Sequence, residues 1–388
     1  MAKSYTPESI GRIDPKFAES TNFYRNINPD QRKGRRLLVA MTDTGAANAI
    51  LPALEILNNN NRVGVLAREA AAAIEVERSA HFAKTTHLDP SYRISRGLDH
   101  VSMVLTGMAS NPTLELLTHK AANELEYSKD TAKMEVVAFE DYPGAYGAEL
   151  KGAFERPELR PNRLLVMNDV AKNANLKELP WLNPDHVFPT GQPAFDYIAS
   201  EDRQAIKASV YERSGVSSSD QLVVWMGQKG GTKEAFEMFI DGAAQMEGDF
   251  RLAIRRHPRD VVSMEEYEDL AGPLKSRLVK TDGIPTSEVG AAADYVVTIF
   301  STEGLSSVMR GIPTLHILNR EILDLTEVPG IVVPVVDASH VIRDATQSRR
   351  VIANLFNERA NQDLQENMAL WKPDGKAAER VARALVAM

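Results

Sequence analysis

Residues 295–318, YVVTIFSTEGLSSVMRGIPTLHIL, decide the fold class of this chain. The segment holds two apolar runs, and between them a helical pattern begins at residue 301 and breaks at Gly311-Ile312-Pro313. A continuous apolar run is typical of a strand in a parallel sheet, because helices cover both faces of such a sheet. The segment therefore predicts a strand, a helix and a second parallel strand.

The start of the predicted helix suits a bound anion. First-turn N–H groups have no partner inside a helix and lie at the positive end of its dipole, so a nucleotide phosphate fits beside Ser301, Thr302 and Gly304. Glu303 would repel a phosphate, but it can accept hydrogen bonds from ribose hydroxyls. In the alternative interpretation Ser301 or Thr302 only caps the helix and Glu303 only complements the dipole. The residues leave both interpretations open.

The composition predicts a two-domain globular protein. A chain of 388 residues is longer than the usual length of a domain with a single hydrophobic core. A formal net charge of −8 argues against nucleic-acid binding. The chain has no cysteine, which excludes disulfides and thiolate metal ligands. We see no signal-peptide pattern and no apolar run long enough to span a bilayer, so the expected location is the cytoplasm. The basic residues Arg32, Lys33, Arg35 and Arg36 suit either a solvated linker or a peripheral contact with anionic lipid.

Two series of alternating strand and helix patterns predict an α/β protein with two doubly wound, Rossmann-like parallel sheets facing a central cleft. The first series has apolar runs at 37–42, 62–67, 101–108, 134–139, 163–167 and 186–190, and the second at 222–226, 251–255, 277–280, 295–300, 314–318 and 331–336. Helical patterns between the runs are clearest at 46–58 and 113–127. The predicted organisation is a polar extension (1–36), an acceptor-side domain (37–195), a linker (196–220) and a nucleotide-binding domain that includes the C-terminal helices (221–388).

Polar residues directly after strands are the candidate site residues, because doubly wound sheets bind ligands outside the carboxyl ends of their strands. After the first strand, Asp43 and Asn48 suit a polyhydroxylated substrate, and the absence of G-x-G-x-x-G argues against an NAD-type cofactor. After the fourth strand, Glu140 or Asp141 can take the proton from an attacking hydroxyl. Consecutive strand positions point to opposite faces, so one of these two should face the cleft. The structural alternatives are a capped turn at Asp43, and a helix cap at Asp141 with Glu140 solvated.

The second domain carries three candidate loops. Gly227 and Lys229 belong to a glycine-rich loop that can meet a phosphate, although the Walker pattern is absent. His257 follows the next strand among three arginines, which disfavour its protonation, so a neutral imidazole N–H can face a phosphate. Gly283 can present its backbone to a nucleotide base, and Ile284 or Pro285 can cover the ring. Plain connecting loops are the alternative. No histidines have metal-ligand spacing, so no metal site is predicted.

Together these motifs resemble the GT-B superfamily of nucleotide-sugar glycosyltransferases, over roughly residue 37 to the end. Residues 191–196, GQPAFD, are similar to the G-x-P-x-x-D step of GT-B relatives, which include the UDP-N-acetylglucosamine 2-epimerases, and residues 301–313 are similar to the donor-binding stretch. The acidic pair at 140–141, the His-Pro step at 257–258 and the Ser-Thr pair at 301–302 occur in the order of motifs in bacterial sialyltransferases and capsule polymer transferases. In this chain Tyr142-Pro143 separates the acidic pair from Gly144, unlike the acidic motif of those enzymes.

The resemblance implies a metal-independent glycosyltransferase that moves a sugar from a UDP-, CDP- or CMP-linked donor to a hydroxyl acceptor (a glycan, a lipid-linked molecule or a small molecule). The nucleotide sugar is a co-substrate, and no cofactor is implied. Asp141 or Glu140 would be the general base, with His257, Ser301 and Thr302 at the donor phosphate. The alternatives are a hydrolysing UDP-N-acetylglucosamine 2-epimerase, a CDP-glycerol-type polymer transferase related to the teichoic-acid glycerophosphotransferases, and a non-catalytic nucleotide-sugar binder. The base, the stereochemical outcome and the oligomeric state do not follow from the residues.

Overall fold

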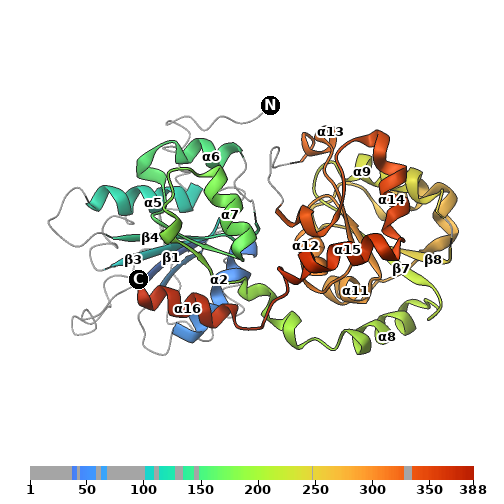
Figure 1. The fold of residues 1–388 in the computed structure, drawn as a ribbon, viewed down its shortest axis with the longest axis horizontal. Coiled ribbons are helices and arrows are strands. Elements are labelled where there is room, and N and C mark those ends of the chain that lie inside the picture. The colour runs from blue at the N-terminus through green and yellow to red at the C-terminus, as the bar shows by residue number, and fades with distance from the viewer. Residues whose placement is uncertain are drawn as a thin grey trace. The chain divides into compact units, whose positions relative to one another are not determined.

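The computed structural model describes residues 37–41, 44–57, 63–67, 101–108, 113–126, 134–143, 148–246, 248–326 and 334–388. The chain divides into a first unit, Met1–Asp196 with Asp374–Met388, and a second unit, Tyr197–Pro373. Each unit contains a six-stranded sheet, and the paired strands run parallel. Helices flank each sheet (Figure 1). The predicted fold class of two doubly wound parallel sheets is confirmed, whereas a shared cleft stays a prediction, and the predicted extension 1–36 lies outside the described residues.

The first sheet has the strand order β2-β1-β3-β4-β5-β6. Its strands are β1 (Leu37–Met41), β2 (Val63–Ala67), β3 (Met103–Thr106), β4 (Glu135–Phe139), β5 (Arg163–Val166) and β6 (Val187–Pro189). Its helices include α2 (Thr44–Leu57), α5 (Thr113–Glu126), α6 (Ala148–Phe154) and α7 (Asp169–Glu178). Alternate residues of β1 serve opposite faces, because Val39 and Met41 share a core with α2 while Leu38 and Ala40 share one with α5.

The second sheet has the order β12-β11-β10-β7-β8-β9. Its strands are β7 (Gln221–Met226), β8 (Phe250–Arg255), β9 (Leu278–Val279), β10 (Tyr295–Thr298), β11 (Thr314–Ile317) and β12 (His340–Ile342). One face is covered by α8 (Arg203–Ser214) and α11 (Thr286–Ala292). On the other face lies α9 (Thr232–Ala243), whose Phe236 and Phe239 rings pack against Trp225 with centroids 5.1 and 6.1 Å away. The direction of winding reverses between β7 and β10, which is the topological switch point.

The segment 295–318 forms β10, α12 (Thr302–Met309) and β11, as predicted. Ser301 is the N-cap of α12 and accepts a hydrogen bond from the N–H of Glu303 at 3.3 Å. The helix ends because Gly311 adopts a φ of +72°, which lets the N–H of Ile312 bond back to the Ser307 carbonyl at 2.9 Å.

The last predicted strand is wrong. We expected it at 331–336, but Pro334–Ala338 is a 3₁₀ helix and the edge strand is β12, which pairs with β11. Pro334 has no N–H to donate to a sheet, which disfavours a strand there. Residues 331–333 lie outside the described residues.

The predicted domain boundaries also change at two places. Among the C-terminal helices, α14 (Ser348–Leu355) and α15 (Glu358–Ala369) lie in the second unit, but α16 (Ala377–Ala387) belongs to the first. The apolar face of α16 explains this, because Val381 and Leu385 are buried in the core beside α2. The expected linker also contains α8, which packs on α11 in the second unit.

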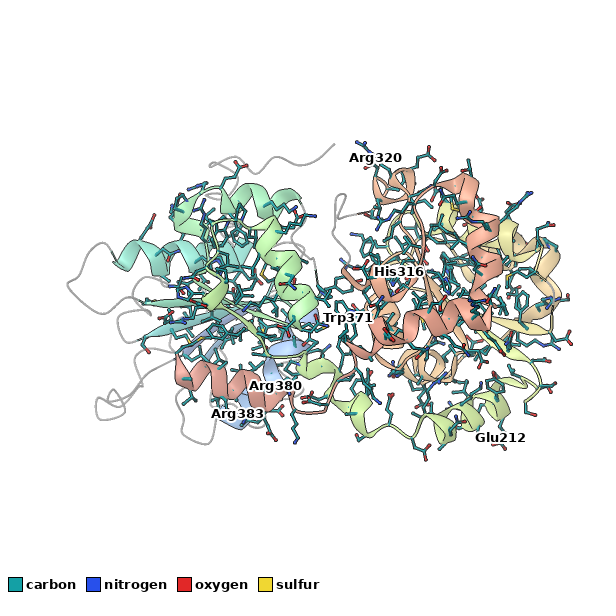
Figure 2. The ribbon with its side chains drawn as sticks, viewed as in Figure 1. Glu212, His316, Arg320, Trp371, Arg380 and Arg383 are labelled. Atoms are coloured by element: carbon teal, nitrogen blue, oxygen red, sulfur yellow. The ribbon has the colours of Figure 1, made fainter. Side chains whose placement is uncertain are left out.

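The segment 191–196 docks helix α16. The Asp196 carboxylate accepts hydrogen bonds from the N–H groups of Ala377 and Ala378, each at 2.9 Å. Gly191 has a φ of +87°, and a Cβ there would lie 2.6 Å from the Ala377 Cβ. Arg380, which is labelled on α16 in Figure 2, donates from Nε to the Thr190 carbonyl at 2.8 Å. The residues that resemble the G-x-P-x-x-D step therefore hold the C-terminal helix on the first unit. Among the described residues, no helix is both long and apolar enough to span a bilayer.

Candidate functional site

Three predicted site loops follow three neighbouring strands of the second sheet. β7 pairs with β8 on one side and with β10 on the other, so Met226 is in register with Arg255 and with Thr298. The loops that begin at Gly227, after Arg255 and after Thr298 therefore lie side by side at the carboxyl edge. This edge includes the switch point, where doubly wound sheets bind their ligands.

Thr298 connects the β7 and β10 ends of this edge. Its hydroxyl donates to the Met226 carbonyl at 3.0 Å and accepts a hydrogen bond from the N–H of Ser301 at 3.2 Å. Ser301 is thereby fixed at the start of α12, where it is half-buried while Thr302 is exposed. The structure shows the capping role of Ser301, and its phosphate role stays a prediction.

Gly304 has a packing role. A Cβ at this position would lie 2.6 Å from Thr298 Cγ2, and the N–H of Gly304 already donates to the Ser301 carbonyl at 2.9 Å. This N–H is therefore engaged inside the helix, and the place of Gly304 beside a phosphate stays a prediction.

The glycines of the loop after β7 allow neighbouring segments to approach closely. A Cβ on Gly227 would lie 2.9 Å from Asp260 Oδ2, and a Cβ on Gly230 would lie 2.4 Å from the Leu325 carbonyl oxygen. Gly231 has a φ of +68° and faces the end of α13 (Arg320–Leu323). Packing thus accounts for the three glycines, and Lys229, which is half-buried, is the cationic residue among them.

A buried hydrogen-bond chain ties the glycine loop to the loop after β8. The N–H of Gln228 donates to Thr232 Oγ1 at 3.3 Å, Thr232 Oγ1 lies 2.8 Å from the Tyr267 hydroxyl, and that hydroxyl donates to Asp260 Oδ2 at 2.8 Å. An ionised carboxylate only accepts, so Thr232 must donate to Tyr267. Tyr267 lies on α10 (Met264–Leu270), and burial raises the pKa of its hydroxyl. The two loops are therefore held in one fixed arrangement.

The orientation of His257 is set by its own turn. The N–H of Arg259 donates to His257 Nδ1 at 3.1 Å, which leaves the proton of the neutral ring on Nε2. The N–H of Asp260 bonds to the His257 carbonyl at 2.9 Å and closes a turn with proline at its second position. The pKa of His257 is lowered by partial burial and by the positive charges of Arg259 and Lys229. The half-buried imidazole is thus a neutral N–H donor, as the sequence predicted.

Arg255 is a cation at the same edge, and its sequence pattern indicated only a positive charge beside His257. Its guanidinium donates to the Thr281 carbonyl at 3.0 Å and to Thr286 Oγ1 at 2.8 Å. Burial lowers its pKa, while Asp282 and Glu303 act in the opposite direction. Its position at a strand end was the signal that could have identified it.

The loop after β9 corrects one predicted role. Ile284 is 4% exposed and belongs to the core shared by α8 and α11, so its side chain packs the interior and does not cover a nucleotide base. Gly283 is exposed with a φ of +73°, and its carbonyl accepts a hydrogen bond from Arg213 at 2.9 Å. Gly283 keeps its predicted place at the carboxyl edge.

His316 lies in the interior of the second unit (Figure 2). Its Nδ1 is 2.9 Å from the Ile299 carbonyl, in the segment that leads into α12. Complete burial lowers its pKa from 6.5 to about 4, so the ring is neutral at pH 7. A neutral ring donates from Nδ1 to the carbonyl and thereby supports the segment before Ser301. An apolar strand pattern hid this role from sequence analysis.

The acidic pair of the first unit occupies two different environments. Glu140 is fully buried and its Oε1 accepts a hydrogen bond from Asn175 Nδ2 at 2.9 Å, so the interpretation of a solvated Glu140 is wrong. Asp141 is half-buried, and its carbonyl accepts from Gln192 Nε2 at 2.6 Å. Asp141 is the more exposed residue of the pair, although its Oδ1 atom is buried. Asn48 is half-buried on α2, and Asp43 lies outside the described residues.

Comparison with known proteins gives matches in structure. No protein-family model matches the sequence, and no curated protein matches it. The structure is similar to the UDP-GlcNAc 2-epimerase from Neisseria meningitidis bound to UDP-GlcNAc, with a TM-score of 0.58, 14% identity, and coverage of 91% of this chain and 100% of that one. For a glycosyltransferase from Rickettsia africae ESF-5 the TM-score is 0.56 at 9% identity, with coverage of 91% of this chain and 97% of that one. For the wall teichoic acid polymerase TagF the TM-score is 0.52 at 10% identity, with coverage of 94% of this chain and 91% of that one. At these identities the similarity shows the fold alone, which is of the GT-B type.

Proposed function

We propose that this chain is a metal-independent transferase that moves a sugar from a UDP-, CDP- or CMP-linked donor to a hydroxyl acceptor. The observation that carries the proposal is the locked carboxyl edge of the second sheet. There the hydrogen bonds through Tyr267 and Asp260 join the loop after β7 to the loop after β8. The hydrogen bonds of Thr298 join the end of β7 to the loop after β10. Hydrogen-bond donors that are held in place before the reaction stabilise the charge that develops in the transition state more effectively than mobile donors do.

Each site residue has a proposed role in this reaction. The neutral Nε2–H of His257, the ammonium of Lys229 and the start of α12 at Ser301 would bind the donor phosphate and stabilise it as the leaving group. Glu303 would accept hydrogen bonds from the ribose. In the first unit, Asp141 would remove the proton of the acceptor hydroxyl, since it is the more exposed residue of the pair and Glu140 is fully buried.

The structural neighbours support a nucleotide-activated substrate. One is an epimerase bound to UDP-GlcNAc, one is a glycosyltransferase, and one is a polymerase soaked with CDPG. The common element in the two ligand-bound structures is a nucleotide-activated group, which matches an edge that offers an imidazole N–H, a lysine and a helix start. We take from these neighbours the class of donor, and both uracil and cytosine remain candidates for its base.

A hydrolysing 2-epimerase is the second candidate, because 100% of the epimerase from Neisseria meningitidis is covered by the match, along with 91% of this chain. Such an enzyme releases UDP and free sugar without an acceptor. A CDP-glycerol-type transferase would instead release CMP as the glycerophosphate chain grows. Mass spectrometry of the products separates these outcomes from glycosyl transfer, and binding without turnover would favour a non-catalytic binder.

The first experiment is a thermal-shift screen of the purified chain against UDP, CDP, CMP, GDP and ADP. A ligand that binds only the native state at 100 times its Kd stabilises it by about 2.7 kcal/mol. We expect a uridine or cytidine nucleotide to raise the Tm, and His257→Ala and Lys229→Ala to abolish the shift. Lys233→Ala is the matched control, because Lys233 lies on the helix after the same loop and pairs with Glu266. No shift with any of the five nucleotides would refute the proposal.

The second experiment tests the base with the donor that the screen identifies. We expect Asp141→Asn to lower kcat by at least about 100-fold, the lower range for general base catalysis, while nucleotide binding stays unchanged. The reaction is repeated with EDTA, and the rate should not change. A wild-type rate for Asp141→Asn would remove Asp141 from the mechanism and make Glu140 the next residue to test.

A further inference from the structure

Arg310 carries a buried charge that the phosphate-binding loops do not use. Its side chain is 1% exposed and that of Glu201 is 12% exposed. The guanidinium contacts this carboxylate with two bonds, Nε to Oε2 and Nη2 to Oε1, each at 2.7 Å. A buried guanidinium is strongly unfavourable without such a partner. The pair therefore fixes the position of Arg310 at the end of α12.

The remaining terminal nitrogen of Arg310 acts on Glu303 through a serine. Arg310 Nη1 donates to Ser306 Oγ at 2.9 Å, and Ser306 Oγ lies 3.0 Å from Glu303 Oε2. Arginine only donates, so the hydrogen of the Ser306 hydroxyl is left for the glutamate, where it is shared between Oε2 and the Glu303 carbonyl at 2.9 Å. Residues 303, 306 and 310 lie on one face of α12 because they are three and four positions apart. The hydrogen bonds thus run in one direction from Arg310 through Ser306 to Glu303.

We propose that Ser306 and Arg310 are positioning residues that hold the Glu303 carboxylate so that the site selects a ribonucleotide over a 2′-deoxyribonucleotide. The inference rests on the proposed function, in which Glu303 accepts hydrogen bonds from the ribose. A carboxylate held in one orientation can accept from two adjacent hydroxyls, and a ligand that lacks one of them leaves an acceptor without its donor. A carboxylate free to rotate would turn to solvent or to the remaining hydroxyl and would discriminate less.

The experiment measures binding of UDP and 2′-deoxy-UDP, and of CDP and 2′-deoxy-CDP, to the full chain by calorimetry. A hydrogen bond to a charged group contributes about 1.5–3 kcal/mol, so the wild type should bind the ribonucleotide at least about tenfold more tightly. We expect Ser306→Ala to weaken ribonucleotide binding about tenfold and to leave deoxyribonucleotide binding unchanged. The ratio of the two affinities should therefore approach one.

Ser307→Ala is the matched control. Ser307 is buried on the same helix, and its hydroxyl donates to the Glu303 backbone carbonyl at 2.7 Å. This variant removes the same atom from the adjacent position and leaves the hydrogen bond between Ser306 and the Glu303 carboxylate in place, so the wild-type ratio should persist. Arg310→Lys, which keeps the charge but loses the two-bond geometry with Glu201, should give a ratio between those of wild type and Ser306→Ala.

The outcomes separate the inference from the proposed function. If the wild type binds none of these nucleotides, or if Glu303→Gln keeps the wild-type ratio, the ribose role of Glu303 fails and the inference fails with it. If Glu303→Gln loses the discrimination while Ser306→Ala keeps it, the positioning role is overturned and the nucleotide site stands. Equal ratios for Ser306→Ala and Ser307→Ala would also overturn it.

Discussion

Asp196→Ala should destabilise the first unit by about 2 kcal/mol. The carboxylate of Asp196 receives the N–H groups of Ala377 and Ala378 at 2.9 Å each, while Lys376, at the N-cap position of α16, makes no side-chain cap bond. Loss of a capping side chain costs about 1 kcal/mol. Loss of a negative charge at a helix N-terminus costs up to about 1 kcal/mol more. The effect should reach the core because Val381 and Leu385 of α16 are buried there.

The assay is urea unfolding followed by circular dichroism and tryptophan fluorescence, with Asp202→Ala as the control. Asp202 also caps a helix, but it is exposed and makes a single bond, to the N–H of Ala205 at 3.0 Å. We expect the control to lose about 1 kcal/mol or less. Asp196→Asn, which keeps an acceptor and loses the charge, should lie between Asp196→Ala and the wild type. If Asp196→Ala unfolds at the same urea concentration as Asp202→Ala, the docking role assigned to Asp196 is wrong.

Three further predictions concern the interior. Tyr267→Phe should lower the unfolding free energy by about 2–3 kcal/mol in urea, because the buried carboxylate of Asp260 loses a donor; an unchanged midpoint would contradict the hydrogen-bond chain. Burial lowers the pKa of His316, and of His119, which is buried on α5, from 6.5 to about 4, so the folded state binds fewer protons than the unfolded state between these pH values. The free energy of unfolding should have its full value above pH 6.5 and fall by about 3 kcal/mol per histidine as the pH drops to 4. Urea titrations at several pH values would measure this change. Gly304→Ala should cost about 1–3 kcal/mol, seen as a lower Tm, because the added methyl would lie 2.6 Å from a methyl carbon of β10.

The fold was predictable because strands buried in parallel sheets carry their signal in consecutive residues. The runs that became β1, β7 and β10 are apolar at nearly every position, and helices cover both of their faces. β12 was missed because it is a three-residue edge strand, His340–Ile342, with only its last residue buried. The position of α16 was missed for another reason, since an amphipathic pattern shows that a helix packs on a core but does not show which core.

The site was predictable to the extent that strand ends locate it. The positions of Gly227, His257 and Ser301 at one edge were predictable because each follows a strand, and the sheet order brings those strands together. The residues that hold them in place come from distant parts of the sequence. Arg310 and Glu201 are 109 positions apart, and neither has a local signal that indicates its partner.

The glycine loop and the crossing segment show how one residue pattern can have two physical causes. Three glycines beside Lys229 suit a phosphate, yet each of them also lies where a Cβ would collide with a neighbouring segment. Asp196 belongs to a segment that resembles the G-x-P-x-x-D step, yet its carboxylate binds the start of a helix 182 positions away. The packing that the fold requires is therefore enough to explain both patterns, whether or not a nucleotide binds. The proposed chemistry has to be tested at residues whose identity is not explained by the described packing contacts. His257, with its Nε2–H group, is the first of these.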